Sequence, residues 1–122
     1  MELSFRWASV YGNHDIGPNL TRLQILEVEQ SYGDLCYTQR MNPDLPGVTN
    51  YYIPIYPPAN STNEEVPVMI WWFFDSQGGR NQFGQQPHYI DPAVIDWFKR
   101  ENQQLRTVWG GLPSLVFFHI PP

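Results

Sequence analysis

The sequence predicts an α/β fold in which a mixed sheet carries flanking helices. Two segments, 19–30 and 91–106, repeat apolar residues at helical spacing and alternate with apolar segments typical of strands. Segment 67–76 is a nearly continuous apolar run, as expected for a strand covered on both faces. The chain has 122 residues, 42% of them hydrophobic and 16% aromatic, which is enough for the core of one domain. The order strand, helix, two or three strands, helix, strand is an α/β pattern with an inserted hairpin.

The first elements are expected to be a strand and a helix. Residues 3–11 are mostly apolar and indicate a strand, which Gly12 ends. Residues 19–30 indicate a helix with Asn19 as its N-cap, since asparagine is a favoured capping residue.

Two further strands are expected in the middle of the chain. Residues 34–41 and 49–56 have strand composition, and the segment 42–47 between them is rich in proline and glycine. Pro54 lacks a backbone N–H, so the second of these strands is expected at an edge or with an interruption.

The second half predicts a long loop, a helix and a last strand. Residues 77–90 are glycine-rich and predict an extended loop. Asp91 and Pro92 are typical of a helix start, so residues 91–106 give the clearest helix of the chain. Residues 114–121 predict the last strand. The first and last strands are apolar enough to be central in a sheet, so we expect residues 1–122 to be one partial domain, an internal piece of a larger one.

Charge and composition argue against some classes of partner. The formal net charge is −5, which disfavours a nucleic-acid partner because a phosphate backbone binds to a basic face. No run of 18 or more apolar residues indicates a membrane span, and no signal peptide is visible. Cys36 is the single cysteine and is expected to be a buried, inert thiol. The localisation stays open.

The segment Gly12–Asp15, with the sequence GNHD, has the chemistry of a reaction site. It follows one predicted strand, and His119 lies at the end of another. If these strands are parallel, both open onto one crevice, because ligands of α/β sheets bind beyond the carboxyl ends of parallel strands. An amide oxygen of Asn13 and a ring nitrogen of His119 are both metal ligands. His14 beside Asp15 has the form of an oriented imidazole that binds a phosphate oxygen or protonates a leaving group.

Simpler interpretations exist for the same residues. Gly12–Asp15 also fits a turn that leads into the helix, and a lone His119 fits a core histidine. Asp75 and Ser76 end an apolar strand, where a loop-capping role is expected. His88 precedes a helix cap and is expected to face solvent.

The order of GNHD, the DS at residues 75–76, the helix at 91–106 and FFHIP resembles the calcineurin-like metallophosphoesterases, in their purple-acid-phosphatase-related (Dcr2-like) branch. The resemblance spans nearly the whole chain. It implies that Asn13 and His119 ligate one metal ion, that His14 contacts phosphate or leaving group, and that Asp15 orients His14. It also implies two divalent or trivalent ions of iron, zinc or manganese in the parent domain, a sandwich of two mixed sheets, and attack of a metal-activated water on a phosphate ester.

Several motifs of that family are absent from the sequence. The Asp-x-His and Gly-Asp motifs that precede GNHD, and the Gly-His-x-His motif after the single histidine, do not occur at matching positions. We therefore expect at most one partial metal site here, an inactive isolated chain, and flanking parts of its own domain as partners. The alternative is a non-catalytic remnant or interaction module that keeps the fold without a complete site. A third hypothesis, from aromatic composition alone, is a sugar-binding β module.

Overall fold

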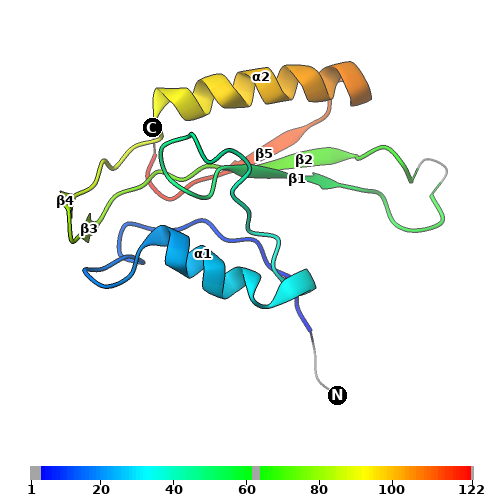
Figure 1. Ribbon diagram of the computed structural model, residues 1–122. Helices are drawn as coiled ribbons and strands as arrows, with labels where there is room; N and C mark the ends of the chain where they lie inside the picture. Colours follow the sequence, from blue (N-terminus) through cyan, green and yellow to red (C-terminus); the bar gives the residue numbers. More distant parts are fainter. Residues whose placement is uncertain (1–3, 62–63, 122) are drawn as a thin grey trace.

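The computed structural model describes residues 4–61 and 64–121 and has mixed α/β content, which confirms the predicted class (Figure 1). Its elements, in chain order, are α1 (Arg22–Gln30), η1 (Gly33–Leu35), β1 (Tyr51–Ile55), β2 (Met69–Phe73), β3 (Arg80–Asn81), β4 (Gly84–Gln85), α2 (Pro92–Trp109) and β5 (Ser114–Phe117). Neither helix is both long and apolar enough to cross a membrane within the described residues.

The main sheet has three strands in the order β1-β2-β5. β1 pairs with β2 antiparallel, with Tyr52 opposite Trp72, and β2 pairs with β5 parallel, with Trp72 opposite Val116. α2 lies between β2 and β5 in the chain, as a parallel crossover requires. β2, the apolar run, is the central strand, because its backbone pairs on both sides.

The sheet lies between two helical layers. Figure 1 shows α2 across one face, and α1 with the N-terminal segment on the other. On the α2 face, the fully buried Trp72 contacts Trp97 and Phe98 of α2 at ring-centroid distances of 6.0 and 4.7 Å, and Val94 beside them is also 0% exposed. Edge-to-face aromatic pairs of this kind add about 0.5–1.5 kcal/mol each to the burial of their surface.

The helix ends follow local capping chemistry. Asp91 caps α2 by accepting a hydrogen bond from the Ala93 N–H, and Pro92 occupies the first turn, as predicted. The predicted cap of α1 is wrong: Thr21, not Asn19, accepts from the Gln24 N–H, and the Gln24 side chain accepts from the Thr21 N–H in return. This reciprocal capping box satisfies two donors, and it starts the helix at residue 22.

The described part of the predicted strand 3–11 forms a single parallel bridge, Trp7 to Cys36, instead of a strand. Alternate side chains of this segment bind one carboxylate on α1. Trp7, Ser9 and Tyr11 all donate hydrogen bonds to Glu29. Alternate side chains therefore lie on the same side of this segment, as they would in a strand. They bind Glu29, but the backbone does not form the hydrogen-bond ladder of a sheet.

Three other predictions about strands need correction. Residues 34–41 form η1 and an irregular segment, and the loop 42–47 does not join a hairpin, because β1 takes β2 as its partner. The loop 77–90 contains the short hairpin of β3 and β4. β5 is an edge strand rather than a central one within the described residues, and Leu115 on it is 48% exposed.

Two buried tyrosines predict loss of stability at high pH. Burial raises the pKa of Tyr11 and of Tyr51 far above their usual value, and the Glu29 carboxylate raises that of Tyr11 further. Each therefore contributes stability that is fully present below pH about 10, the unfolded value, and that decreases as the pH rises toward the folded pKa. We expect the free energy of unfolding in urea to fall above pH 10 by about 1.4 kcal/mol per pH unit for each tyrosine.

The control for this experiment is a tyrosine at the surface. Tyr51→Phe should reduce the slope above pH 10, at a cost of about 1 kcal/mol at neutral pH from its hydrogen bond to Ser9. Tyr56→Phe, which removes a hydroxyl from a side chain that is 47% exposed, should leave the free energy of unfolding at neutral pH nearly unchanged. A free energy of unfolding that is constant between pH 9 and pH 11 would contradict the assignment.

Candidate functional site

The candidate site lies at one rim of the sheet. β2 and β5 are parallel, so their carboxyl ends meet at the same edge. Asp75 follows β2 by two residues and His119 follows β5 by two. β1 runs the other way, so Asn50, which precedes it, lies at this rim as well. Three segments distant in sequence thus bring polar side chains to one place.

The segment Gly12–Asp15 is a tight turn closed by two hydrogen bonds. The Asp15 N–H donates to the Gly12 carbonyl at 3.3 Å, and the Asp15 carboxylate accepts from the Gly12 N–H at 2.6 Å. These two bonds close the turn and leave Asn13 and His14 at its tip, where His14 is exposed. The turn interpretation and the site interpretation of this segment are therefore compatible.

Asn13 and His119 meet across 106 residues of sequence. His119 Nε2 lies 3.1 Å from Asn13 Oδ1. A Cβ on Gly12 would lie 3.2 Å from the His119 ring, so the glycine lets the backbone of the turn approach the imidazole closely. The expected juxtaposition at one rim is present, although the described residues 4–11 lead to it as an irregular segment instead of a strand.

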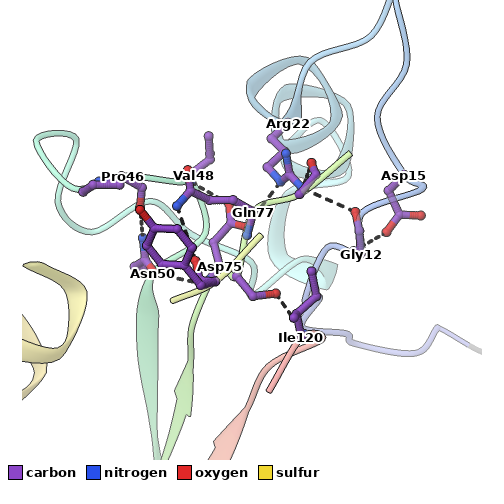
Figure 2. Close-up of polar contacts among 12 residues, drawn as sticks. Gly12, Asp15, Arg22, Pro46, Val48, Asn50, Asp75, Gln77 and Ile120 are labelled. Carbon is purple, nitrogen blue, oxygen red and sulfur yellow. Dashed lines mark hydrogen bonds and ion pairs between the residues drawn. The ribbon is translucent and has the colours of Figure 1, made fainter. Parts of the chain in front are cut away.

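A buried ion pair holds the segments of the site together. Arg22, in the first turn of α1, places Nε 3.3 Å from Oδ1 of Asp75, and the two side chains are 8% and 0% exposed. Arg22 Nη2 also donates to the carbonyl of Gly78 at 3.0 Å and, at 3.5 Å, to that of Gly12. One guanidinium thus contacts the turn at Gly12 and two positions, Asp75 and Gly78, in the segment that follows β2 (Figure 2).

Asp75 also organises the loops around it, as Figure 2 shows. Its carboxylate accepts from the N–H groups of Val48 at 2.7 Å and Gln77 at 2.8 Å, which confirms the predicted loop-capping role. The next residue, Ser76, accepts from the N–H of Ile120 at 3.0 Å. This last bond fixes the chain immediately after His119 against the end of β2.

Two glycines allow the loop after β2 to approach Asn13. A Cβ on Gly79 would lie 2.2 Å from the Asn13 carbonyl oxygen, and one on Gly78 would lie 2.8 Å from Asn13 Cβ. Both glycines have positive φ, at 95° for Gly78 and 82° for Gly79. Only residues without a side chain fit this approach, so the glycine-rich loop forms a wall of the site.

The predicted site residues stand as follows. The structure brings Asn13, His14 and His119 to one rim. Asp15 binds the Gly12 N–H, and no hydrogen bond joins it to His14 within the described residues, so its role of orienting His14 stays a prediction.

Two more residues complete the picture of the rim. His88 is exposed, as expected, and a Cβ on Gly78 would lie 3.4 Å from its Cβ, so it borders the site. Sequence reasoning missed Arg22. The helix dipole disfavours a positive charge in the first turn of a helix. An arginine at this position is therefore unusual, and that was the one sequence signal that could have indicated a special role for Arg22.

The donor atoms of Asn13 and His119 fit a shared cation. Adjacent ligands about 2.1 Å from one ion are about 3.0–3.4 Å apart in octahedral or tetrahedral geometry, and the observed 3.1 Å lies in this range. Without an ion, the same distance fits a hydrogen bond from His119 Nε2–H to the amide oxygen. Within residues 4–61 and 64–121, no group of three or more His, Cys, Asp or Glu side chains could hold a metal.

Two cavities are candidates for a ligand-binding site. A groove of about 890 Å³ is lined mainly by apolar and aromatic side chains, among them Trp7, Tyr52, Trp71 and Trp109. A smaller cleft of about 490 Å³ adjoins the rim and is lined by Asn13, His14 and polar residues of the β3–β4 hairpin. The smaller cleft is the better candidate, because convergent polar groups orient a ligand and give specificity, whereas apolar area alone does not.

Over nearly its whole length the chain is similar to phosphatases and purple-acid-phosphatase-like proteins. Phosphatase DCR2 of Saccharomyces cerevisiae is 33% identical over an alignment 129 residues long, which covers 94% of this chain and 20% of that protein. Two Arabidopsis thaliana proteins, probable inactive purple acid phosphatases 28 and 29, are 26% and 25% identical and cover 99% and 94% of this chain. These likenesses confirm the resemblance that the motifs predict.

The chain spans 20–34% of the length of these curated relatives. No family model matches it, and no solved structure gives a significant match. The two helices of the structure overturn the hypothesis of an all-β sugar-binding module.

The close approach at Gly79 is testable with a matched pair of glycines. Gly79→Ala should destabilise the fold by about 2 kcal/mol more than Gly84→Ala, since steric clashes and backbone strain cost about 1–3 kcal/mol each. Gly84 also has positive φ, at 110°, but nothing lies within 4 Å of its Cβ position, so it shares the strain without the clash. Equal losses in urea unfolding for the two variants would show that the loop does not contact Asn13.

Proposed function

We propose that this chain forms part of a metal-dependent phosphoesterase of the calcineurin-like kind, which hydrolyses phosphate esters. The observation that carries the proposal is the 3.1 Å distance between Asn13 Oδ1 and His119 Nε2 at the carboxyl-end rim of the sheet. The similarity to named phosphatases supports it. Residues 1–122 would be one partial domain, completed by flanking parts of the same domain.

Asn13 and His119 would hold one of two metal ions. An oxygen donor and an imidazole suit iron, zinc or manganese. A bound ion supplies Lewis-acid polarisation of a phosphate oxygen and lowers the pKa of a water molecule. Two sets of hydrogen bonds fix these donors. The bonds between Gly12 and Asp15 hold the turn that carries Asn13, and the bond from the Ile120 N–H to Ser76 holds the chain next to His119. The remaining ligands would come from the flanking parts of the same domain.

His14 would act on the substrate itself. It is exposed at the tip of the turn, next to Asn13, and both side chains line the 490 Å³ cleft. From there an imidazole donates a hydrogen bond to a phosphate oxygen or gives a proton to the leaving alcohol. Asp15 would keep His14 in place by closing the turn.

The second candidate function is a non-catalytic domain that retains the fold. Two of the relatives carry names that call them probable inactive phosphatases. The rim offers two ligand-type side chains in contact, Asn13 and His119, and a catalytic zinc site has about three protein ligands. The two functions differ in whether the whole protein turns over a phosphate ester.

Hydrolysis of para-nitrophenyl phosphate by the full-length protein, with Mn²⁺, Zn²⁺ or Fe²⁺ added, tests the proposal. We expect metal-dependent release of nitrophenol, and a fall in kcat of about 10²-fold or more for His14→Ala, as is usual for loss of a general acid. No turnover with any of the three metals would favour the non-catalytic alternative.

The 122-residue chain alone should bind divalent metal weakly and through Asn13 and His119. Calorimetric titration with Mn²⁺ should give weak heats that Asn13→Ala and His119→Ala abolish, because each removes one of two donors. Asn19→Ala, at an exposed asparagine outside the rim, is the control and should bind as the parent chain does. Tight stoichiometric binding, or binding that survives both rim variants, would contradict the assigned ligands.

A further inference from the structure

The cleft beside Asn13 has a second wall that the proposed chemistry does not use. The cleft of about 490 Å³ lies between the segment from Asn13 to Pro18 and the β3–β4 hairpin. Asn13 belongs both to this cleft and to the contact with His119. A phosphate held at that contact therefore has its ester substituent next to the cleft.

The position of the hairpin wall is fixed by the same network that builds the rim. Gly79 approaches the Asn13 backbone so closely that no side chain fits between them. The Gly78 carbonyl accepts from Arg22 Nη2 at 3.0 Å. Arg80 follows directly as the first residue of β3, so its distance from Asn13 depends on this packing.

Most polar side chains of the hairpin are engaged in holding the hairpin itself. Asn81 Oδ1 accepts from the Phe83 N–H at 2.8 Å and from Gln86 Nε2 at 3.1 Å. Gln85 Nε2 donates to the Gly79 carbonyl at 3.0 Å. These groups are therefore not available to a ligand without loss of the hairpin.

Arg80 differs from its neighbours. It is exposed, it lines the cleft, and its guanidinium makes no hydrogen bond or ion pair with the part of the chain that the structure describes. It is also the only Lys or Arg among the described residues that line the cleft. In a chain of net charge −5, this is a local positive charge in an otherwise acidic molecule.

We propose that the cleft receives the alcohol part of a phosphate-ester substrate, and that Arg80 binds an oxyanion group on that alcohol. The inference rests on the proposed function, because it takes the Asn13–His119 contact as the phosphate end. A guanidinium presents a rigid fork of donors that matches the paired oxygens of a carboxylate or a phosphate. Arg80 is thus a specificity-determining residue that favours esters with a second negative charge.

Three non-hydrolysable probes separate the two ends of the site. Benzylphosphonate carries the phosphate-like end alone, (4-carboxybenzyl)phosphonate adds a carboxylate, and para-xylylene bisphosphonate adds a second phosphonate. Each is titrated calorimetrically into the full-length protein with Mn²⁺ present. We expect one or both of the probes with a second anionic group to bind about five- to tenfold more tightly than benzylphosphonate. This gain is what one partly exposed, charge-assisted contact contributes. Which of the two gains more identifies the oxyanion.

The variants assign that gain to one side chain. Arg80→Gln should remove it, so that the two longer probes lose more affinity than benzylphosphonate does, while Arg80→Lys should keep part of it. Arg100→Gln, at an exposed arginine on α2, removes the same charge elsewhere and should have no effect. The gain should also decrease as salt is added.

The outcomes distinguish the inference from the function on which it rests. If benzylphosphonate binds but the charged probes gain nothing, or if their gain survives Arg80→Gln, the assignment of Arg80 is wrong and the phosphate site stands. If benzylphosphonate itself does not bind, the phosphate site fails and the inference fails with it.

Discussion

The buried ion pair between Arg22 and Asp75 is the interaction on which the rest of the site depends. Taking two charges out of water is costly, and such a pair is maintained only when further bonds satisfy the remaining donors and acceptors. Here further bonds satisfy part of the pair: Arg22 Nη2 donates to the carbonyls of Gly12 and Gly78, and the Asp75 carboxylate accepts from the Val48 N–H. Within the described residues, Arg22 Nε has its ion pair with Asp75 and no hydrogen bond. Four segments that are remote in sequence therefore share one electrostatic centre at the end of β2.

This centre determines where the chemical groups lie. The arginine bond to the Gly12 carbonyl places the turn that carries Asn13, and the residue after Asp75 holds the chain that follows His119. The two donor atoms end 3.1 Å apart, although no backbone hydrogen bond joins their own segments in the part of the chain that the structure describes. An imidazole and an amide oxygen held in this way are preorganised, so little conformational entropy is lost when a ligand binds. The same anchoring sets the loop that leads to Arg80.

The sequence predicts the local parts of this structure and misses the non-local ones. The helix at 91–106 and the central strand within 67–76 were predictable because caps and apolar pattern are local signals. The strand predicted at 34–41 fails because its backbone bonds go to several partners: Leu35 and Tyr37 bond to Trp7, Cys36 bonds to Gly33 and Met41 bonds to Asn50. Nothing in the composition of the segment reveals these partners. In the site, the contact of Asn13 with His119 was predicted from the rule on strand ends and from family resemblance. It occurs although the described segment before Asn13 forms a single bridge instead of a strand. Arg22 was not predicted, because the burial of a cation depends on partners that lie far away in the sequence.

The most direct test of this account is a double-mutant cycle on the ion pair, with Arg22→Met, Asp75→Asn and both together, measured by urea unfolding and by the NMR signals of the His119 ring. We predict that each single change costs about 3 kcal/mol, that the double change costs about 2 kcal/mol less than the sum, and that all three shift the ring signals. Single-variant losses that add within about 0.5 kcal/mol, with His119 signals unchanged, would show that the ion pair does not hold the site together.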